Sequence, residues 1–194
     1  MREERRVESV QIDVGSLVRR SVASLYSHLV TRPTGRAVRL AIETQLAEAD
    51  GTSCFLIDLS QVTVLDFSCA DEVVAKLLAR YLADDRPRDA FFVFRGVMER
   101  HQGPIEVVLE RHRLAAVAEV EGGYHLLGMR SGPEAMVWAM VEERGTLPGT
   151  LVQALFPRVE EQEALEALVR RRLVFRAPVG EVLALSRLVR GLPA

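Results

Sequence analysis

The sequence predicts an α/β domain with a central sheet and flanking helices, followed by a smaller, mostly helical module. Strand-like apolar runs alternate with amphipathic helical segments over residues 8–128, which is typical of an α/β arrangement. The segment "MRSGP" then interrupts the pattern, and helical spacing dominates beyond it. We therefore expect two units, residues 1–130 and residues 131–194.

The first half of the domain contains two predicted strands and two predicted helices. "VESVQIDV" alternates as a strand does, and "GSLVRRSVASLYSHLV" has helical spacing. A second helix follows in "TRPTGRAVRLAIETQLAEAD" and is expected to end at Gly51. In "TSCFLIDLS", the run from Cys54 to Ile57 is apolar without alternation, so we expect a strand buried on both faces.

The second half of the domain continues the alternation. Apolar rows predict a helix from Ser68 to Leu82, which "DDRPRD" ends, and "AFFVFRGV" predicts another strand. "GPIEVVLERHRL" is expected to be helical. "AAVAEVEGGYHLLG" predicts a final hairpin that turns at Gly122-Gly123.

The C-terminal module has a different pattern. "PEAMVWAMVEERG", "LPGTLVQALFP" and "VEEQEALEALVRRR" predict three helices. "LVFRAP" predicts a strand, and "EVLALSRLV" predicts a further strand or helix after a Pro-Val-Gly turn. Three helices followed by a hairpin is the order of a winged-helix module, although a plain helical extension would give a similar pattern.

Composition narrows the classes of function. The net charge of −2 gives no broad electrostatic reason to expect nucleic acid as a partner. No apolar run approaches a membrane span, no signal peptide is recognisable, and the two cysteines lack metal-ligand spacing. We therefore expect a cytoplasmic protein that needs no membrane, metal or other cofactor.

Small and acidic side chains gather where the strand after Gly51 gives way to a helix. Ser68 and Asp71 have the Ser-x-x-acid spacing of a capping box, and Asp71 and Glu72 suit the dipole of a helix start. Helix capping alone accounts for these residues. The alternative is a charged docking surface for a protein partner, formed by Asp66, Ser68, Asp71, Glu72 and Lys76.

The segment "LIDLSQVTVLDFS" and its helix resemble the central motif of STAS domains, the fold of anti-sigma-factor antagonists. Asp58, Leu59, Ser60 and Val62 match the first half of that motif, and Asp66 and Ser68 match the second half. "LDFSCADE" is still more similar to the STAS-like group of unknown function. The resemblance implies a partner of the histidine-kinase ATPase type and phosphorylation of a loop serine.

The sequence departs from the STAS motif at the expected phosphoacceptor. Phe67 stands directly after Asp66, where that serine commonly lies, so Ser68 is the possible phosphoacceptor here. A phosphoryl group on Ser68 would add negative charge beside acidic side chains and could switch partner binding. The resemblance thus favours a non-enzymatic regulatory protein that binds a kinase-type ATPase or a transcription regulator through residues 58–82.

Two alternatives depend on other residues. Arg170, Arg171 and Arg172 cluster at the end of the third C-terminal helix and could contact phosphates in a DNA-binding transcription regulator. The same helix carries four glutamates, which favours protein contact or homodimerisation over DNA binding. Cys69 at a helix start could be a nucleophile, but a small residue packed at a tight junction explains it better.

Overall fold

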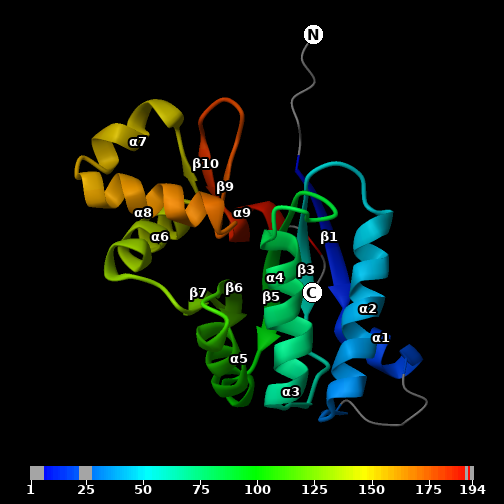
Figure 1. Cartoon of the computed structure of the whole chain (residues 1–194). Helices are drawn as coiled ribbons and strands as arrows, with labels where there is room; N and C mark the ends of the chain where they lie inside the picture. Colours follow the sequence, from blue (N-terminus) through cyan, green and yellow to red (C-terminus); the bar gives the residue numbers. More distant parts are fainter. Residues whose placement is uncertain (1–6, 22–27, 191, 193–194) are drawn as a thin grey trace.

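A five-stranded sheet lies at the centre of the protein and confirms the predicted α/β class (Figure 1). The computed structural model describes residues 7–21, 28–190 and 192. The sheet has the order β1-β3-β5-β6-β7, in which the first four strands are parallel and β7 is antiparallel to β6. Its strands are β1 (Glu8–Asp13), β3 (Ser53–Asp58), β5 (Ala90–Val97), β6 (Ala115–Val120) and β7 (Gly123–Gly128).

Helices from the first 130 residues cover one face of the sheet. They are α1 (Val14–Ser21), α2 (Arg32–Glu48), a continuous helix of α3 (Phe67–Ala70), η1 (Asp71–Lys76) and α4 (Leu77–Leu82), and α5 (Glu99–Arg111). Their apolar side chains pack on Phe55, Ile57 and Phe94 of the sheet. A short parallel ladder of β2 (His28–Leu29) and β4 (Val64–Leu65) precedes α3.

The C-terminal residues that the structure describes form four helices and a small antiparallel sheet. They comprise α6 (Gly132–Arg144), β8 (Thr146–Leu147), α7 (Gly149–Leu155), α8 (Val159–Arg170), β9 (Val174–Arg176), β10 (Val182–Ala184) and α9 (Leu185–Val189). The small sheet has the order β8-β10-β9. The three predicted helices and the hairpin after them are present, and β8 is an additional strand.

This C-terminal module packs on the second face of the central sheet. Cys54, Leu56 and Val93 point away from the first layer of helices and into a core shared with the module. On the module side, this core contains Trp138 and Leu168. The sheet is therefore buried on both faces, as predicted for the strand at residues 53–58, where every residue is buried.

Several element boundaries differ from those predicted. The helix expected over residues 15–30 ends at Ser21, residues 22–27 lie outside the described part, and residues 28–29 form a strand. Helix α5 begins at Glu99 and continues through Pro104. The β6-β7 turn falls on Glu121 and Gly122, both with positive φ, so it lies one residue earlier than expected.

Candidate functional site

Asp66 caps the helix that begins at Phe67. Its carboxylate accepts a hydrogen bond from the Cys69 backbone N–H at 2.8 Å, and the Ser68 hydroxyl donates to the same carboxylate at 2.9 Å. The predicted cap by Ser68 is therefore wrong. Ser68 lies inside the first turn, two positions beyond Asp66, and Asp66 occupies the position from which a side chain reaches the free N–H groups.

Asp71 and Glu72 are buried, with only 7 % and 2 % of their surfaces exposed. They lie on the π-helical turn η1, which packs against α2 and α5. The structure thus contradicts the expectation that these two carboxylates form an exposed docking surface. The physical reason is that cations from α2 and η1, and the His112 ring after α5, surround them, which allows both charges to be taken out of water.

The ion pairs around these two residues form a compact network, which we call the Asp71–Glu72 cluster. Its members are Arg32, Arg39, Asp71, Glu72, Lys76 and His112. Arg32 Nη1 lies 2.7 Å from Asp71 Oδ2 and 3.1 Å from Glu72 Oε1, so one guanidinium joins both carboxylates. On the other side of Asp71, His112 Nε2 lies 2.7 Å from Oδ1.

The remaining contacts of the cluster satisfy Glu72 and connect three helices. Arg39 Nε lies 3.2 Å from Glu72 Oε2, and Lys76 Nζ contacts Glu72 as well as Asp71. Arg32 and Arg39 belong to α2, and His112 follows α5. The cluster therefore fixes the orientation of the helix from Phe67 to Leu82 against both of its neighbours.

The electrostatic balance keeps both carboxylates ionised. Burial alone would raise the pKa of Asp71, but hydrogen bonds from Arg32 and His112 and the charge of Lys76 lower it to about 2. Burial also opposes ionisation of Glu72, while Lys76 and Arg39 lower the pKa of that carboxyl below its usual value. Because the cations outweigh desolvation at both residues, the cluster is charged and paired at neutral pH.

Exposed apolar residues lie at the same junction of strand and helix, where only charged side chains were expected at the surface. Phe67 is 55 % exposed at the first helical position, and Val30 and Val64 are 48 % and 37 % exposed. Leu29 and Leu65 pair across the β2-β4 ladder and are buried, so the neighbouring residues of each strand face outward. We call Val30, Val64 and Phe67 the Phe67 patch.

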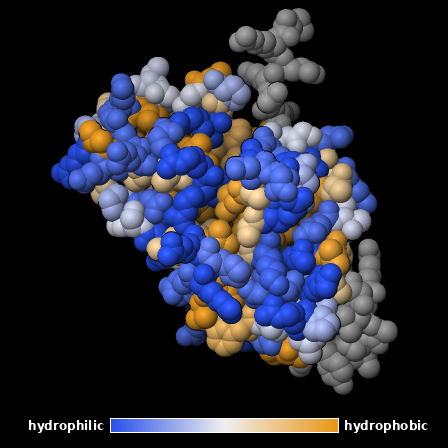
Figure 2. Space-filling view, viewed as in Figure 1, coloured by the Kyte–Doolittle hydropathy of each residue, from blue (hydrophilic) through white to orange (hydrophobic). Residues whose placement is uncertain are grey.

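Figure 2 shows hydrophobic side chains at the lower end of the molecule, where α3 begins in Figure 1. In the sequence, Phe67 stands out only as a departure from the STAS motif. The signal that could have revealed the patch is the alternation around Leu65, which places Val64 opposite to a buried neighbour. Asp66 and Ser68 are half-buried and flank the patch. Together with Lys76 on η1, they are the predicted partner-binding residues that remain at the surface.

Cys69 is buried beneath this junction. Burial, followed by the nearby negative charge of Asp66, raises the pKa of its thiol to about 12. The sulfur lies 3.0 Å from the Thr31 carbonyl oxygen, to which the thiol donates. A protonated, buried thiol is a poor nucleophile, so the geometry supports the packing interpretation of Cys69.

Two of the three clustered arginines contact other parts of the protein. Arg171 Nη1 lies 2.8 Å from Glu134 Oε1 on α6, and Arg172 Nη2 lies 2.6 Å from Asp89 Oδ1. Arg172 also stacks over the Phe91 ring, with 5.1 Å between its guanidinium carbon and the ring centre. Of the three, Arg170 alone is exposed, and Arg171 and Arg172 are half-buried, so they do not form one free basic surface.

Comparisons with known proteins give no relatives: no family model, no curated protein and no solved structure matches the chain. Among residues 7–21, 28–190 and 192, no helix is long and apolar enough to cross a membrane. Within the same residues, no group of three or more side chains is arranged to hold a metal ion.

Proposed function

We propose that this protein is a non-enzymatic regulator that binds a protein partner through residues 58–82. The observation that carries the proposal is the 55 % exposure of Phe67 at the start of α3, beside Val30 and Val64. An aromatic ring contributes much of its binding energy through burial, on the order of 1–2 kcal/mol for a half-exposed Phe. A partner that offers an apolar side chain would gain this energy.

The Asp71–Glu72 cluster supports such a contact indirectly. It joins η1 to α2 and to the end of α5, and the Asp66 cap fixes the first turn. A surface that is rigid before binding loses less conformational entropy on association. In this proposal Asp71, Glu72 and Lys76 hold the docking helix in place, and the direct contacts come from the Phe67 patch, Asp66 and Ser68.

Ser68 offers a way to regulate the contact. Its hydroxyl donates to Asp66, and it directly follows Phe67 in the chain. A phosphoryl group there would replace the hydroxyl donor with a dianion beside the Asp66 side chain. The dianion would repel the Asp66 carboxylate and attract water to the Phe67 patch. The resemblance to STAS domains supplies the class of partner, a histidine-kinase-type ATPase. The free, buried thiols of Cys54 and Cys69 fit a cytoplasmic location, which is part of the same proposal.

Affinity capture of the full chain from its native cells, with quantitative mass spectrometry, tests the proposal. We expect Phe67→Ser to reduce recovery of a specific partner by about tenfold, which corresponds to about 1.4 kcal/mol. Val179→Ser is the matched control, because Val179 is an exposed apolar residue of the C-terminal module. Equal recovery by wild type and the Phe67 variant would refute the proposed contact. The same samples report phosphorylation of Ser68.

A DNA-binding regulator is the second candidate. The order of helices and the hairpin after residue 131, with the additional strand β8, favours a winged-helix-like module. The exposed face of α8 carries Glu160, Glu163 and Glu166, which would repel phosphates. We therefore propose protein contact or homodimerisation for this module. Sedimentation and duplex-binding measurements at low salt distinguish these roles.

A further inference from the structure

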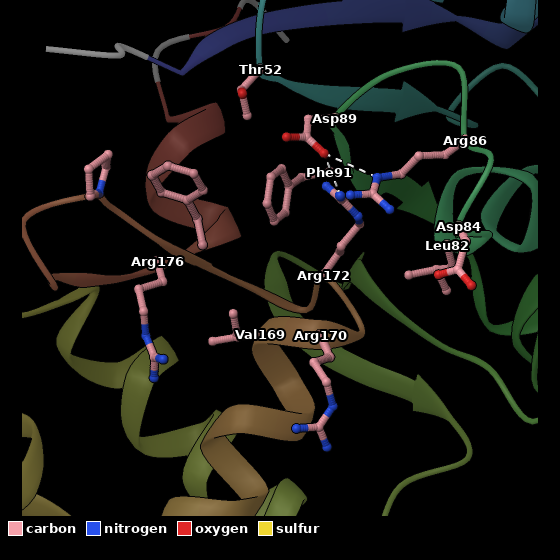
Figure 3. A pocket seen from close by; sticks show the side chains of 12 residues that line it. Thr52, Leu82, Asp84, Arg86, Asp89, Phe91, Val169, Arg170, Arg172 and Arg176 are labelled. Atoms are coloured by element: carbon pink, nitrogen blue, oxygen red, sulfur yellow. Dashed lines mark hydrogen bonds and ion pairs between the residues drawn. The ribbon is translucent and has the colours of Figure 1, made fainter.

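A hollow of about 610 Å³ lies between the central domain and the C-terminal module (Figure 3). One wall is the loop between α4 and β5, which contains Arg86 and Asp89. The other wall is the end of α8 and the following strand β9, with Arg170, Arg172 and Arg176. Its volume is within the range of small-molecule sites, and both parts of the protein line it.

Positive charge exceeds negative charge around this pocket. Arg86 Nε and Arg172 Nη2 both donate to a single oxygen, Asp89 Oδ1, at 3.1 and 2.6 Å. Hydrogen bonding to Arg172 and Arg86 lowers the pKa of the Asp89 carboxyl despite its partial burial. One carboxylate therefore serves two guanidiniums. Nη1 of Arg86 and of Arg172 also donates to a backbone carbonyl, so the remaining N–H groups are the donors that could bind an anion.

Two more arginines add to this excess. In Figure 3, Arg170 and Arg176 flank Val169 on the side opposite Asp89. Arg176 Nη1 is paired with Glu166 at 2.7 Å, whereas Arg170 has no ion-pair partner among the residues that the structure describes. Four arginines line the pocket, against the carboxylates of Asp84 and Asp89 and that of Glu166, which pairs with Arg176. The remaining excess of positive charge favours an anionic ligand.

The pocket also has an apolar part. Phe91 and Phe175 meet edge to face, with ring centres 5.3 Å apart, and Val169 and Pro178 lie beside them. Phe91 is buried, with Arg172 over its ring, so the accessible apolar side chains are those of Phe175, Val169 and Pro178. A ring or a short hydrocarbon would pack against them, which a bare anion could not do. The combination of arginines and aromatic rings is suited to a ligand that carries a charged group and an apolar body.

We propose that this pocket binds a small phosphorylated organic molecule. The phosphate would accept hydrogen bonds from the arginines, and the organic part would lie against Phe175 and Val169. Because its walls come from both parts of the chain, the bound molecule would stabilise the packing of the C-terminal module on the sheet. This inference does not depend on the Phe67 patch, which lies at the other end of α3–α4.

Phenyl phosphate is the simplest probe of this class, and its binding to the full chain can be followed by NMR titration. Inorganic phosphate and phenol test the two halves of the ligand separately, and we expect each to bind at least about tenfold more weakly. Shifted resonances should include those of Phe91 and Phe175. Absence of binding, or equal binding of inorganic phosphate and phenyl phosphate, would overturn the proposal.

Three variants test the residues. Arg170→Ala removes the exposed arginine, and we expect affinity for phenyl phosphate to fall about tenfold because a charge-assisted contact is lost. Glu166→Gln releases Arg176 and should raise affinity about threefold. Arg36→Ala, an exposed arginine on α2 outside the pocket, is the matched control and should bind as wild type. Unchanged affinity in both pocket variants would overturn the assignment of these arginines.

Discussion

Replacing Asp71 with Asn tests whether the buried carboxylate stabilises the fold through its cations. The pKa of Asp71 lies at about 2, against an ordinary 3.8. A shift of this size corresponds to about 2 kcal/mol. The side chain of Arg32 is 50 % exposed, so solvent screens part of the attraction. We therefore expect Asp71→Asn to lower the free energy of unfolding at pH 7 by about 1 kcal/mol.

The lowered pKa of Asp71 also predicts how this stabilisation changes with pH. The folded state lowers the pKa of Asp71, so the stabilisation is complete above pH 4 and is lost as pH falls toward 2. Urea unfolding, monitored through Trp138 fluorescence, should show that the difference between wild type and variant shrinks to about half by pH 3. Asp85→Asn is the control, because Asp85 is exposed. A difference that is absent at pH 7, or unchanged at pH 3, would refute the reasoning.

Four further changes have defined outcomes. Gly35→Ala should lower the free energy of unfolding by about 1–3 kcal/mol, because its Cβ would lie 2.9 Å from Cys69 Cα, and any stabilisation contradicts this packing. Asp66→Ala should cost about 1 kcal/mol in urea unfolding, and Asp66→Ser should recover much of it, unless another group caps the helix. Burial raises the pKa of the Cys54 and Cys69 thiols to about 12. Both thiols should therefore react with a disulfide reagent at pH 8 at least about tenfold more slowly in the folded protein than in the denatured protein, and rapid labelling of the folded protein would disprove their burial. A chain ending at residue 130 should aggregate in size-exclusion chromatography because one apolar face of its sheet is uncovered, and a soluble monomer would contradict the shared core.

The alternation of elements in the domain could be predicted because its signals are local. The uninterrupted apolar run from Cys54 to Ile57 identified a strand with two buried faces, and the turn after Val120 identified a hairpin. The end of a helix at Ser21 and the short β2-β4 ladder could not be predicted in the same way. A two-residue strand has no periodicity, so its pairing depends on the surrounding tertiary structure.

The charged residues at the strand-helix junction could be identified from the sequence, but their burial could not. Two acidic residues at a helix start are usually exposed to solvent. Asp71 and Glu72 are buried because they pair with Arg32 and Arg39, more than 30 residues earlier, and with His112, about 40 residues later. Sequence spacing cannot show that these partners converge. A π-helical turn is also invisible in a hydrophobic pattern, although such turns often occur at functional sites.

The C-terminal module shows the same limit at a larger scale. Its three helices follow from local periodicity, and the break at residues 129–133 suggested a separate unit. Leu168 and Trp138 nevertheless share a core with Leu56 and Val93 of the sheet. An apolar residue in the sequence indicates that it will be buried, but not which surface will cover it. The packing of one unit on the other could therefore not be predicted from the sequence.

The burial of β3 on both sides has a consequence for how the chain finds its alignment. A strand with one solvent-exposed face would expose apolar side chains if its register shifted by one residue. Both faces of β3 are buried, so hydrophobic alternation does not disfavour such a shift. A polar residue at the end of β3 specifies the register instead. Asp58 accepts a hydrogen bond from Gln11 Nε2 on β1 at 3.1 Å, and another from the Ser60 backbone N–H at 2.9 Å. A shift of β3 against β1 would break the bond from Gln11, whereas the bond from Ser60 lies within one segment and would remain. The Gln11–Asp58 contact therefore marks the correct alignment of β1 with β3.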